Sequence, residues 1–199
     1  MKNSWDERYS TSTNLFGISP NEFLVSQQDK LRSGMKTLAI GDGEAHNGIW
    51  LAQQGLNVTS VDVSNVAAEK AKRNAAQADV SIDIIQADIV DFLSPDKKYD
   101  LIVHLFVHIT ATSKTSFHQK MINALNPKGY IIFECFHKAQ LQVATGGPRE
   151  IDMLYDEEEM CQDFKQLDII SLQKVDTNVF EESKGDQPGV SLQFIGRKK

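Results

Sequence analysis

An apolar run that breaks into a short glycine-containing turn is the feature that most constrains this chain. Residues 37–47 read Thr-Leu-Ala-Ile-Gly-Asp-Gly-Glu-Ala-His-Asn, and a second apolar run from Val58 ends at Asp62, 21 residues after Gly41. This spacing predicts two buried strands joined through a helix. In such a unit the glycine turn admits a ligand close to the backbone, and the later acid accepts hydrogen bonds from ribose hydroxyls. We therefore expect a Rossmann-like site for an adenosine-bearing cofactor.

Strand and helix signals alternate along the rest of the chain, which predicts a largely parallel sheet with helices on both faces. The expected strands are 36–41, 57–62, 81–86, 101–107 and 130–136, and the expected helices are 20–32, 47–54, 64–78, 113–125 and a short one from Asp156. Two further strand-like runs, 168–181 and 189–197, are joined by the turn-rich segment 183–189. That connection is too short for a crossover helix, so these two strands must be antiparallel.

The composition favours a single globular domain that binds small molecules. The chain has 199 residues, of which 41% are hydrophobic, and a formal net charge of −6 with no dominant Lys/Arg block. Nucleic acid and anionic membrane are therefore not expected partners. Residues 1–9 lack the apolar core of a signal peptide, and no apolar stretch approaches the roughly 20 residues of a membrane helix, so we expect a cytoplasmic protein. Cys135 and Cys161 lack metal-ligand spacing, and no metal is expected.

The charge of the glycine turn discriminates between cofactors. A dinucleotide site normally has the pattern G-x-G-x-x-G, but here the last position is His46. Asp42 and Glu44 would repel a pyrophosphate at this helix start. The same acids suit S-adenosylmethionine (SAM), which carries an amino group and a sulfonium and no phosphate. Asp88 after the third strand, the turn 125–129 and the terminal hairpin point the same way.

These features make the chain resemble the class I SAM-dependent methyltransferases, and within them the small branch similar to tellurite-resistance and thiopurine methyltransferases. The resemblance also rests on the segments 5–9, 16–17, 20–21, 106–108 and 145–148. It implies a seven-stranded, mostly parallel sheet with an antiparallel last strand. It also implies one domain over 1–199, divided into an N-terminal lid arm and helix (1–34), a cofactor-binding core (35–136), a substrate-side loop and helix (137–165) and a C-terminal hairpin (166–199).

The resemblance implies a role for each candidate site residue. Cofactor contacts are expected from Gly41, Asp42, Gly43, Glu44, Ala45, Asn47, Asp62, Val63, Asp88, Ile89, His104, Leu105 and Phe106. Gly41 to Ala45 would wrap the methionine moiety, Asp62 would bind the ribose, and Asp88 with Ile89 would flank the adenine. His104 to Phe106 would line the cleft beside the sulfonium. Trp5, Tyr9 and Phe16 would close over cofactor and substrate as a lid, with His46 on the substrate side.

Methyl transfer from a sulfonium mainly requires a nucleophile held near the methyl carbon with water excluded. The expected acceptor is a small-molecule nucleophile, such as a thiol, a chalcogen oxyanion or a similar metabolite, and the expected assembly is a monomer or weak homodimer. If a general base is used, His108 is the first candidate, followed by His46 and His104. The alternative is that these histidines only pack or form hydrogen bonds.

Two positions depart from the family pattern and leave alternatives open. The family turn usually reads acid-x-Gly-x-Gly-x-Gly, whereas this chain has Ala39 at the acid and Ala45 at the third glycine. One alternative is therefore a catalytically silent SAM-binding protein. The other is an NAD(P)-dependent oxidoreductase on a Rossmann-like fold, which the acidic turn and the missing third glycine disfavour.

Overall fold

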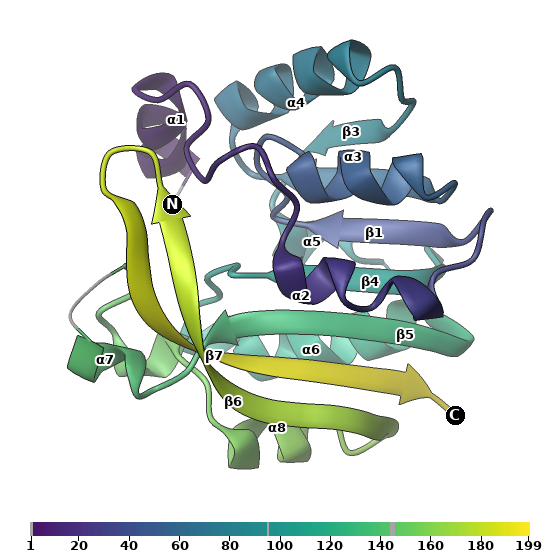
Figure 1. Ribbon diagram of the computed structural model, residues 1–199. Helices are drawn as coiled ribbons and strands as arrows, with labels where there is room; N and C mark the ends of the chain where they lie inside the picture. The colour runs from purple at the N-terminus through teal and green to yellow at the C-terminus, as the bar shows by residue number, and fades with distance from the viewer. Residues whose placement is uncertain (1, 95, 144–145) are drawn as a thin grey trace.

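A twisted seven-stranded sheet forms the centre of the molecule in the computed structural model, which describes residues 2–94, 96–143 and 146–199 (Figure 1). Thr145 of the segment 145–148 lies outside the described residues. The strands are β1 (Lys36–Ile40), β2 (Asn57–Asp62), β3 (Asp83–Gln86), β4 (Tyr99–Leu105), β5 (Leu125–Phe136), β6 (Leu167–Glu181) and β7 (Gly185–Lys198). Their order is β3-β2-β1-β4-β5-β7-β6. The first five pair in parallel, and β7 is antiparallel to both β5 and β6, which confirms the predicted fold class.

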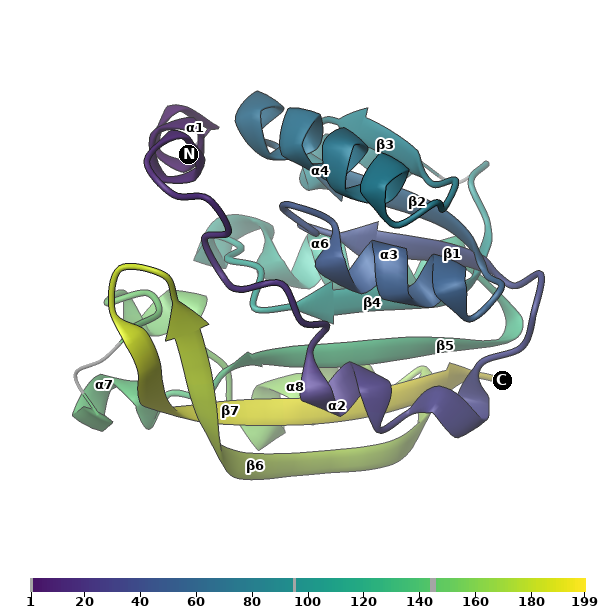
Figure 2. The same ribbon diagram turned by 45° about the horizontal axis from the view of Figure 1, so that its top comes forward.

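Helices cover both faces of the sheet. On one face lie α2 (Glu22–Val25), α3 (His46–Gln53) and α4 (Asn65–Gln77), and on the other lie α6 (Ala111–Ala124) and α8 (Glu157–Asp163), as Figure 2 shows. The remaining helices are α1 (Lys2–Ser10), α5 (Ile89–Phe92) and α7 (Gln140–Val143), with 3₁₀ turns at Gln28–Lys30 and Ile151–Met153. Among the described residues, no helix is long and apolar enough to cross a membrane.

Local sequence explains where the longer helices begin. Ser64 caps α4, since its side chain accepts a hydrogen bond from the backbone N–H of Ala67 at 3.1 Å. Asp156 caps α8 in the same way through the N–H of Glu159 at 2.8 Å, and the acids of the segment 157–159 favour the positive end of that helix. Small residues then let α4 pack closely on the sheet, and the buried ones are Ala67, Ala68, Ala71 and Ala75.

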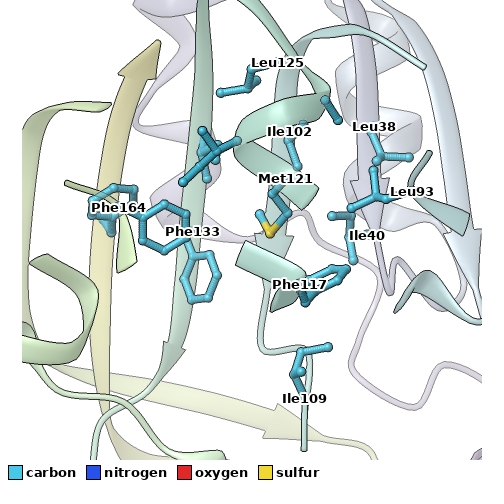
Figure 3. Packing of buried hydrophobic residues seen from close by; sticks show 14 of the residues in the cluster. Leu38, Ile40, Leu93, Ile102, Ile109, Phe117, Met121, Leu125, Phe133 and Phe164 are labelled. Atoms are coloured by element: carbon cyan, nitrogen blue, oxygen red, sulfur yellow. The ribbon is translucent and has the colours of Figure 1, made fainter. Parts of the chain in front are cut away.

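The central strands are apolar on both faces because each face is covered. Figure 3 shows the larger core, in which Ile102 and Phe133 of the sheet lie against Phe117 and Met121 of α6, with Phe164 just after α8. All five of these side chains are fully buried. A second core, which includes Leu24 and Leu51, packs the opposite face.

Several predicted boundaries differ from the structure. The prediction of a helix at 20–32 is wrong, since only α2 and a 3₁₀ turn form there. Phe23 and Leu24 are the buried residues of this segment, and the apolar stripe is too short to support a longer helix. Further upstream, residues 2–10 form helix α1, which was not predicted. The C-terminal hairpin is tighter than predicted, since β7 begins at Gly185 and pairs with β6 as far as Glu181. Both strands of this hairpin therefore extend well beyond the rest of the sheet.

Candidate active site

A cavity of about 1400 Å³ opens beside the carboxyl ends of the parallel strands. It lies next to the turns that follow β1 and β4, which are neighbours in the sheet although β2 and β3 come between them in the chain. The strand order reverses at this point, which is where open α/β sheets bind their ligands. The cavity is therefore the candidate site.

Two glycines shape the floor of the cavity. Gly41 and Gly43 have φ values of 58° and 57°, a left-handed conformation that glycine adopts readily. A Cβ at Gly41 would lie 2.6 Å from the side chain of Val107, and one at Gly43 would overlap the hydroxyl of Tyr9. Only glycine therefore fits at these two positions, and the backbone of the turn packs directly against Val107 and Tyr9.

Asp62 is held in place by backbone donors at the end of β2. Its Oδ2 accepts from the N–H of Gly43 at 2.9 Å, and its Oδ1 accepts from the N–H of Ser64 at 2.8 Å. The residue is only 9% exposed, and burial raises the pKa of its carboxyl. Each carboxylate oxygen can accept a further hydrogen bond, so Asp62 remains able to bind ribose hydroxyls.

Asp42 lines the cavity, but its carboxyl is buried and holds the glycine turn from beneath. Its Oδ2 accepts from the hydroxyl of Ser60 at 2.9 Å and from the N–H of Gly48 at 3.1 Å. Burial raises the pKa of this carboxyl to about 7. Asp42 thus contributes structure by binding Ser60, the residue of β2 that pairs with the buried Ala39 of β1.

The carboxylate of Glu44 is also bound by groups inside the protein. Its Oε1 lies 2.9 Å from Nζ of Lys70, and its Oε2 accepts from the N–H of Leu15 at 2.8 Å. From the sequence we expected the charges of Asp42 and Glu44 to face the cofactor. The structure corrects this expectation, because the carboxyl of Asp42 is buried under the turn and that of Glu44 is paired with Lys70.

Most of the predicted site residues line the cavity. They are Trp5, Tyr9, Phe16, Gly41, Asp42, Gly43, Glu44, His46, Asn47, Asp62, Val63, Asp88, Ile89, Leu105, Phe106 and His108. Ala45 and His104 are not among its lining residues. Ala45 is fully buried with φ 63° and packs in the core at the start of α3. His104 points to the opposite face of the sheet, where its ring stacks on Phe133 at 3.9 Å, because side chains alternate along β4.

The N-terminal arm, residues 2–21, lies over one side of the cavity. Tyr9 is buried, and its ring lies 6.0 Å from that of Trp5 and 6.4 Å from that of Phe16. Nζ of Lys70 holds the arm through the carbonyl of Ser12 at 2.7 Å. The expected lid is thus fastened to α4 and to the glycine turn.

The tip of the β6–β7 hairpin lies beside the arm (Figure 1), and residues 175–181 of β6 line the cavity. Arg8 of the arm pairs with Glu181 at 3.1 Å, and the N–H of Glu182 donates to the carbonyl of Leu15 at 2.9 Å. The sequence analysis did not predict that the hairpin contributes to the site. The length of its strands could have indicated this, since they are longer than the strands that they extend.

Asn21 and Glu134 are further site residues to which the sequence analysis assigned no role. The uncharged Asn21 joins two elements. Its N–H donates to Oδ1 of Asn47 at 2.8 Å, and its Nδ2 donates to Oε2 of Glu134 at 2.7 Å. Oε1 of Glu134 accepts from Ser191 and Gln193 of β7. This network ties α3, β5 and β7 to the end of the arm.

His108 lies among the aromatic rings that line the cavity. Its ring centroid is 6.0 Å from that of Trp5 and 6.2 Å from that of Phe136. Burial, assisted by the nearby charge of Arg8, lowers the pKa of His108 to about 4. The imidazole is therefore neutral at pH 7 and can accept a proton, although as a weak base.

Comparison with known proteins shows what this part of the chain is similar to. Residues 37–129 match the model of a methyltransferase domain, over just under half of the chain. A ubiquinone biosynthesis O-methyltransferase of Rickettsia akari is 26% identical to it over 125 residues, which are 63% of this chain and 49% of the relative. The chain thus spans about half the length of that relative.

Solved structures share the fold of the methyltransferase domain. TehB from Haemophilus influenzae superposes with a TM-score of 0.78 and 19% identity, over 98% of this chain and 67% of TehB. The N-methyltransferase NodS from Bradyrhizobium japonicum, solved with S-adenosyl-L-homocysteine (SAH), gives a TM-score of 0.71 and 18% identity, over 99% and 97% of the two chains.

The residues of the methyltransferase domain fit SAM, its cofactor. The two glycines and Asp62 suit the backbone and ribose of an adenosyl amino acid. Nε2 of His46 is buried at the start of α3, and the described residues give it no hydrogen-bond partner. A ring N–H and a helix N-terminus together favour the binding of a carboxylate. SAM carries one carboxylate, and its other charged groups are positive.

Proposed function

We propose that this protein transfers the methyl group of SAM to a small-molecule nucleophile inside the cavity. The observation that carries the proposal is the junction of Gly43 and Asp62, at which a bare backbone turn and a fixed carboxylate meet at the switch point of the sheet. SAM supplies a methyl group on a good leaving group. The protein's own contribution is to orient the two reactants and exclude water.

Each part of the site has a role in this proposal. Gly41, Gly43 and His46 hold the amino acid end of SAM, and Asp62 holds the ribose. Val63, Asp88 and Ile89 surround the adenine, while Leu105 and Phe106 border the reacting centre. The ring cluster and the hairpin tip then enclose the acceptor. His108 accepts the proton of the acceptor where the reaction releases one.

The remaining features of the proposal concern the whole protein. The cavity lies between the arm and the hairpin, and its enclosure suits a small acceptor rather than nucleic acid. We propose that the protein acts in the cytoplasm as a monomer or weak homodimer, with the segments 1–34, 35–136, 137–165 and 166–199 as lid arm, cofactor core, substrate-side segment and hairpin of one domain. Analytical ultracentrifugation with and without SAM tests the assembly.

Calorimetric titration with SAM, SAH and NADH tests the cofactor site directly. We expect the two adenosyl-sulfur ligands to bind and NADH not to bind. Asp62→Ala removes charge-assisted hydrogen bonds worth about 1.5–3 kcal/mol, so SAM affinity should fall roughly 10- to 150-fold. Asp168→Ala, on an exposed part of β6, is the matched control and should bind as the parent protein does. Equal SAM affinity of the parent and Asp62→Ala would contradict the proposed site.

Turnover distinguishes an enzyme from a silent SAM-binding protein. Ala45 keeps this alternative open, because it holds a left-handed conformation where the family has glycine. SAH release with an added nucleophile supports the proposal. Tight SAM binding without SAH release across nucleophiles of all classes would favour the silent alternative, and selective NADH binding would favour the oxidoreductase.

A further inference from the structure

The charges around the cavity are strongly unbalanced. Among its described lining residues, the carboxylates are Glu22, Asp42, Glu44, Asp62, Asp88, Asp91, Glu134, Asp176, Glu181 and Asp186, and the one lysine or arginine is Arg8. Arg8 is already paired with Glu181 at 3.1 Å, and its guanidinium lies 4.7 Å from the ring centroid of Trp5. An oxyanion entering this cavity would therefore meet repulsion and find no unpaired cation in the described lining.

The histidines of the lining do not change this balance at neutral pH. Burial lowers the pKa of His46 and lowers that of His108 to about 4. Both rings are consequently uncharged at pH 7. The field that an acceptor meets is set mainly by the other carboxylates, because Glu44 pairs with Lys70, and Glu181 pairs with both Arg8 and Lys184.

The acceptor side of the cavity is built from rings. Centroid distances of 6.3 Å from Phe16 to Trp5, 6.0 Å from Trp5 to His108, 6.2 Å from His108 to Phe136 and 4.8 Å from Phe136 to Phe106 connect the arm to the ends of β4 and β5. Phe106 holds φ 53°, so the chain turns sharply after β4 to present this ring. The rings are tilted by 48° to 62° to one another, and such an apolar surface favours an aromatic molecule, which can contact it by its face or its edge.

The size of the cavity leaves room for that molecule beside the cofactor. About 1400 Å³ exceeds the roughly 300–1,000 Å³ that is usual for a pocket holding one small ligand. An inorganic oxyanion would leave most of the aromatic rings in contact with water. The free energy that the oxyanion loses by leaving bulk water would not be compensated.

Charge during the reaction selects among organic nucleophiles. When a neutral nitrogen attacks, its lone pair forms the bond to the methyl carbon and the C–S bond breaks with its electron pair going to sulfur. The positive charge then passes from sulfur to nitrogen and stays beside the carboxylates, which stabilise it before and after transfer. A thiol must first become a thiolate, and a negative field disfavours that ionisation.

We infer that the methyl acceptor is an aromatic nitrogen nucleophile, such as a ring nitrogen or aryl amine, that enters the cavity uncharged. This inference rests on the proposed function and specifies its acceptor. It excludes the chalcogen oxyanions and thiolates that the sequence left open. A ring nitrogen needs no base, and an aryl amine releases one proton after transfer, for which neutral His108 is a nearby acceptor.

Acceptors of one shape and different charge test the inference. Isoquinoline, 2-naphthalenethiol and isoquinoline-5-carboxylate share a flat two-ring body, and sodium selenite represents the oxyanions. With SAM-loaded protein, we expect isoquinoline to release SAH with a kcat/KM at least tenfold above those of the other three. Equal or faster turnover of selenite, of the thiol or of the carboxylate analogue would overturn the inference while leaving the methyltransferase function intact.

Binding to the SAH complex gives a readout that does not depend on turnover. Isoquinoline should bind this complex at least tenfold more tightly than its carboxylate analogue, as measured by NMR line broadening. Phe136→Leu should weaken isoquinoline binding severalfold and retain SAH affinity, which also reports that the variant is folded. Failure of isoquinoline to bind more tightly than the carboxylate overturns the inference, whereas failure of SAM itself to bind overturns the proposed function together with it.

Discussion

The backbone N–H of Gly43 donates a hydrogen bond to Oδ2 of Asp62 at 2.9 Å, across 19 residues of chain. This bond joins the turn after β1 to the end of β2. It fixes the orientation of a carboxylate whose pKa is raised by burial, and it holds the turn against the sheet. The two sequence features that first indicated a nucleotide site are thus one hydrogen-bonded unit, and the predictions below concern the residues that support it.

The close approach of Tyr9 makes Gly43 sensitive to substitution. Gly43→Ala places a methyl group where φ is 57° and where the Tyr9 hydroxyl already lies. Gly185 has φ 67° with open space around it, so Gly185→Ala carries only the backbone cost of about 1 kcal/mol. We expect Gly43→Ala to lower the free energy of unfolding by about 2–4 kcal/mol in urea titrations. Adding Tyr9→Phe should restore part of the loss, and similar losses for both alanine variants would contradict the overlap.

Lys70 and Glu44 form a buried ion pair that fastens the arm. Their side chains are 13% and 2% exposed, so Lys70→Met leaves an uncompensated carboxylate. Loss of one partner of a buried pair typically costs about 3–5 kcal/mol, and we expect about 2–4 kcal/mol here because Lys70 retains some exposure. The exposed pair Glu69–Lys72 on the same helix is the control, and Lys72→Met should change stability by less than about 0.5 kcal/mol.

A double-mutant cycle separates the pair from its surroundings. The double variant Glu44→Gln with Lys70→Met should be less destabilised than the sum of the two single variants, because neither buried charge is then left alone. Strict additivity, measured by chemical denaturation, would show that Lys70 acts only through the carbonyl of Ser12.

Asp42 should make the stability fall as the pH rises from about 4 to about 7. Its pKa in the folded protein is about 7, above the ordinary 3.8, so the folded state binds more protons than the unfolded state in that window. The free energy of unfolding then decreases by up to about 1.4 kcal/mol per pH unit. Asp42→Asn keeps an oxygen acceptor and should remove this slope, whereas Asp168→Asn should leave it. Identical pH slopes for the parent and Asp42→Asn would refute the raised pKa.

His108 should act in the opposite direction. Its pKa in the folded protein is about 4, below the ordinary 6.5, because burial disfavours the charged ring. The stability it contributes is complete above pH 6.5 and is lost as the pH falls towards 4, by up to about 3 kcal/mol. His108→Gln should therefore be less sensitive to acid than the parent, as measured by thermal unfolding between pH 4 and 7. Equal acid sensitivity would show that the ring titrates normally.

Local patterns in the sequence determined the order of the strands and the positions of the glycine turn and of Asp62. The glycine turn, Asp62 and the Ser64 cap act through backbone conformation and through neighbours close in the chain. These effects follow residue types directly, so their positions were predictable. The antiparallel pairing of the last two strands was predictable too, because a short connection permits only one arrangement.

Tertiary structure alone decided where the charges of Asp42 and Glu44 point, which face His104 occupies, and what encloses the acceptor. The face that His104 occupies depends on the register in which β4 pairs with β1 and β5, and no local pattern fixes that register. The partners of Glu44 are Lys70 and Leu15, and those of the arm lie on the hairpin, at separations of 26 to 173 residues. A local pattern carries no information about such distant partners, because they are brought together only by the packing of the whole sheet.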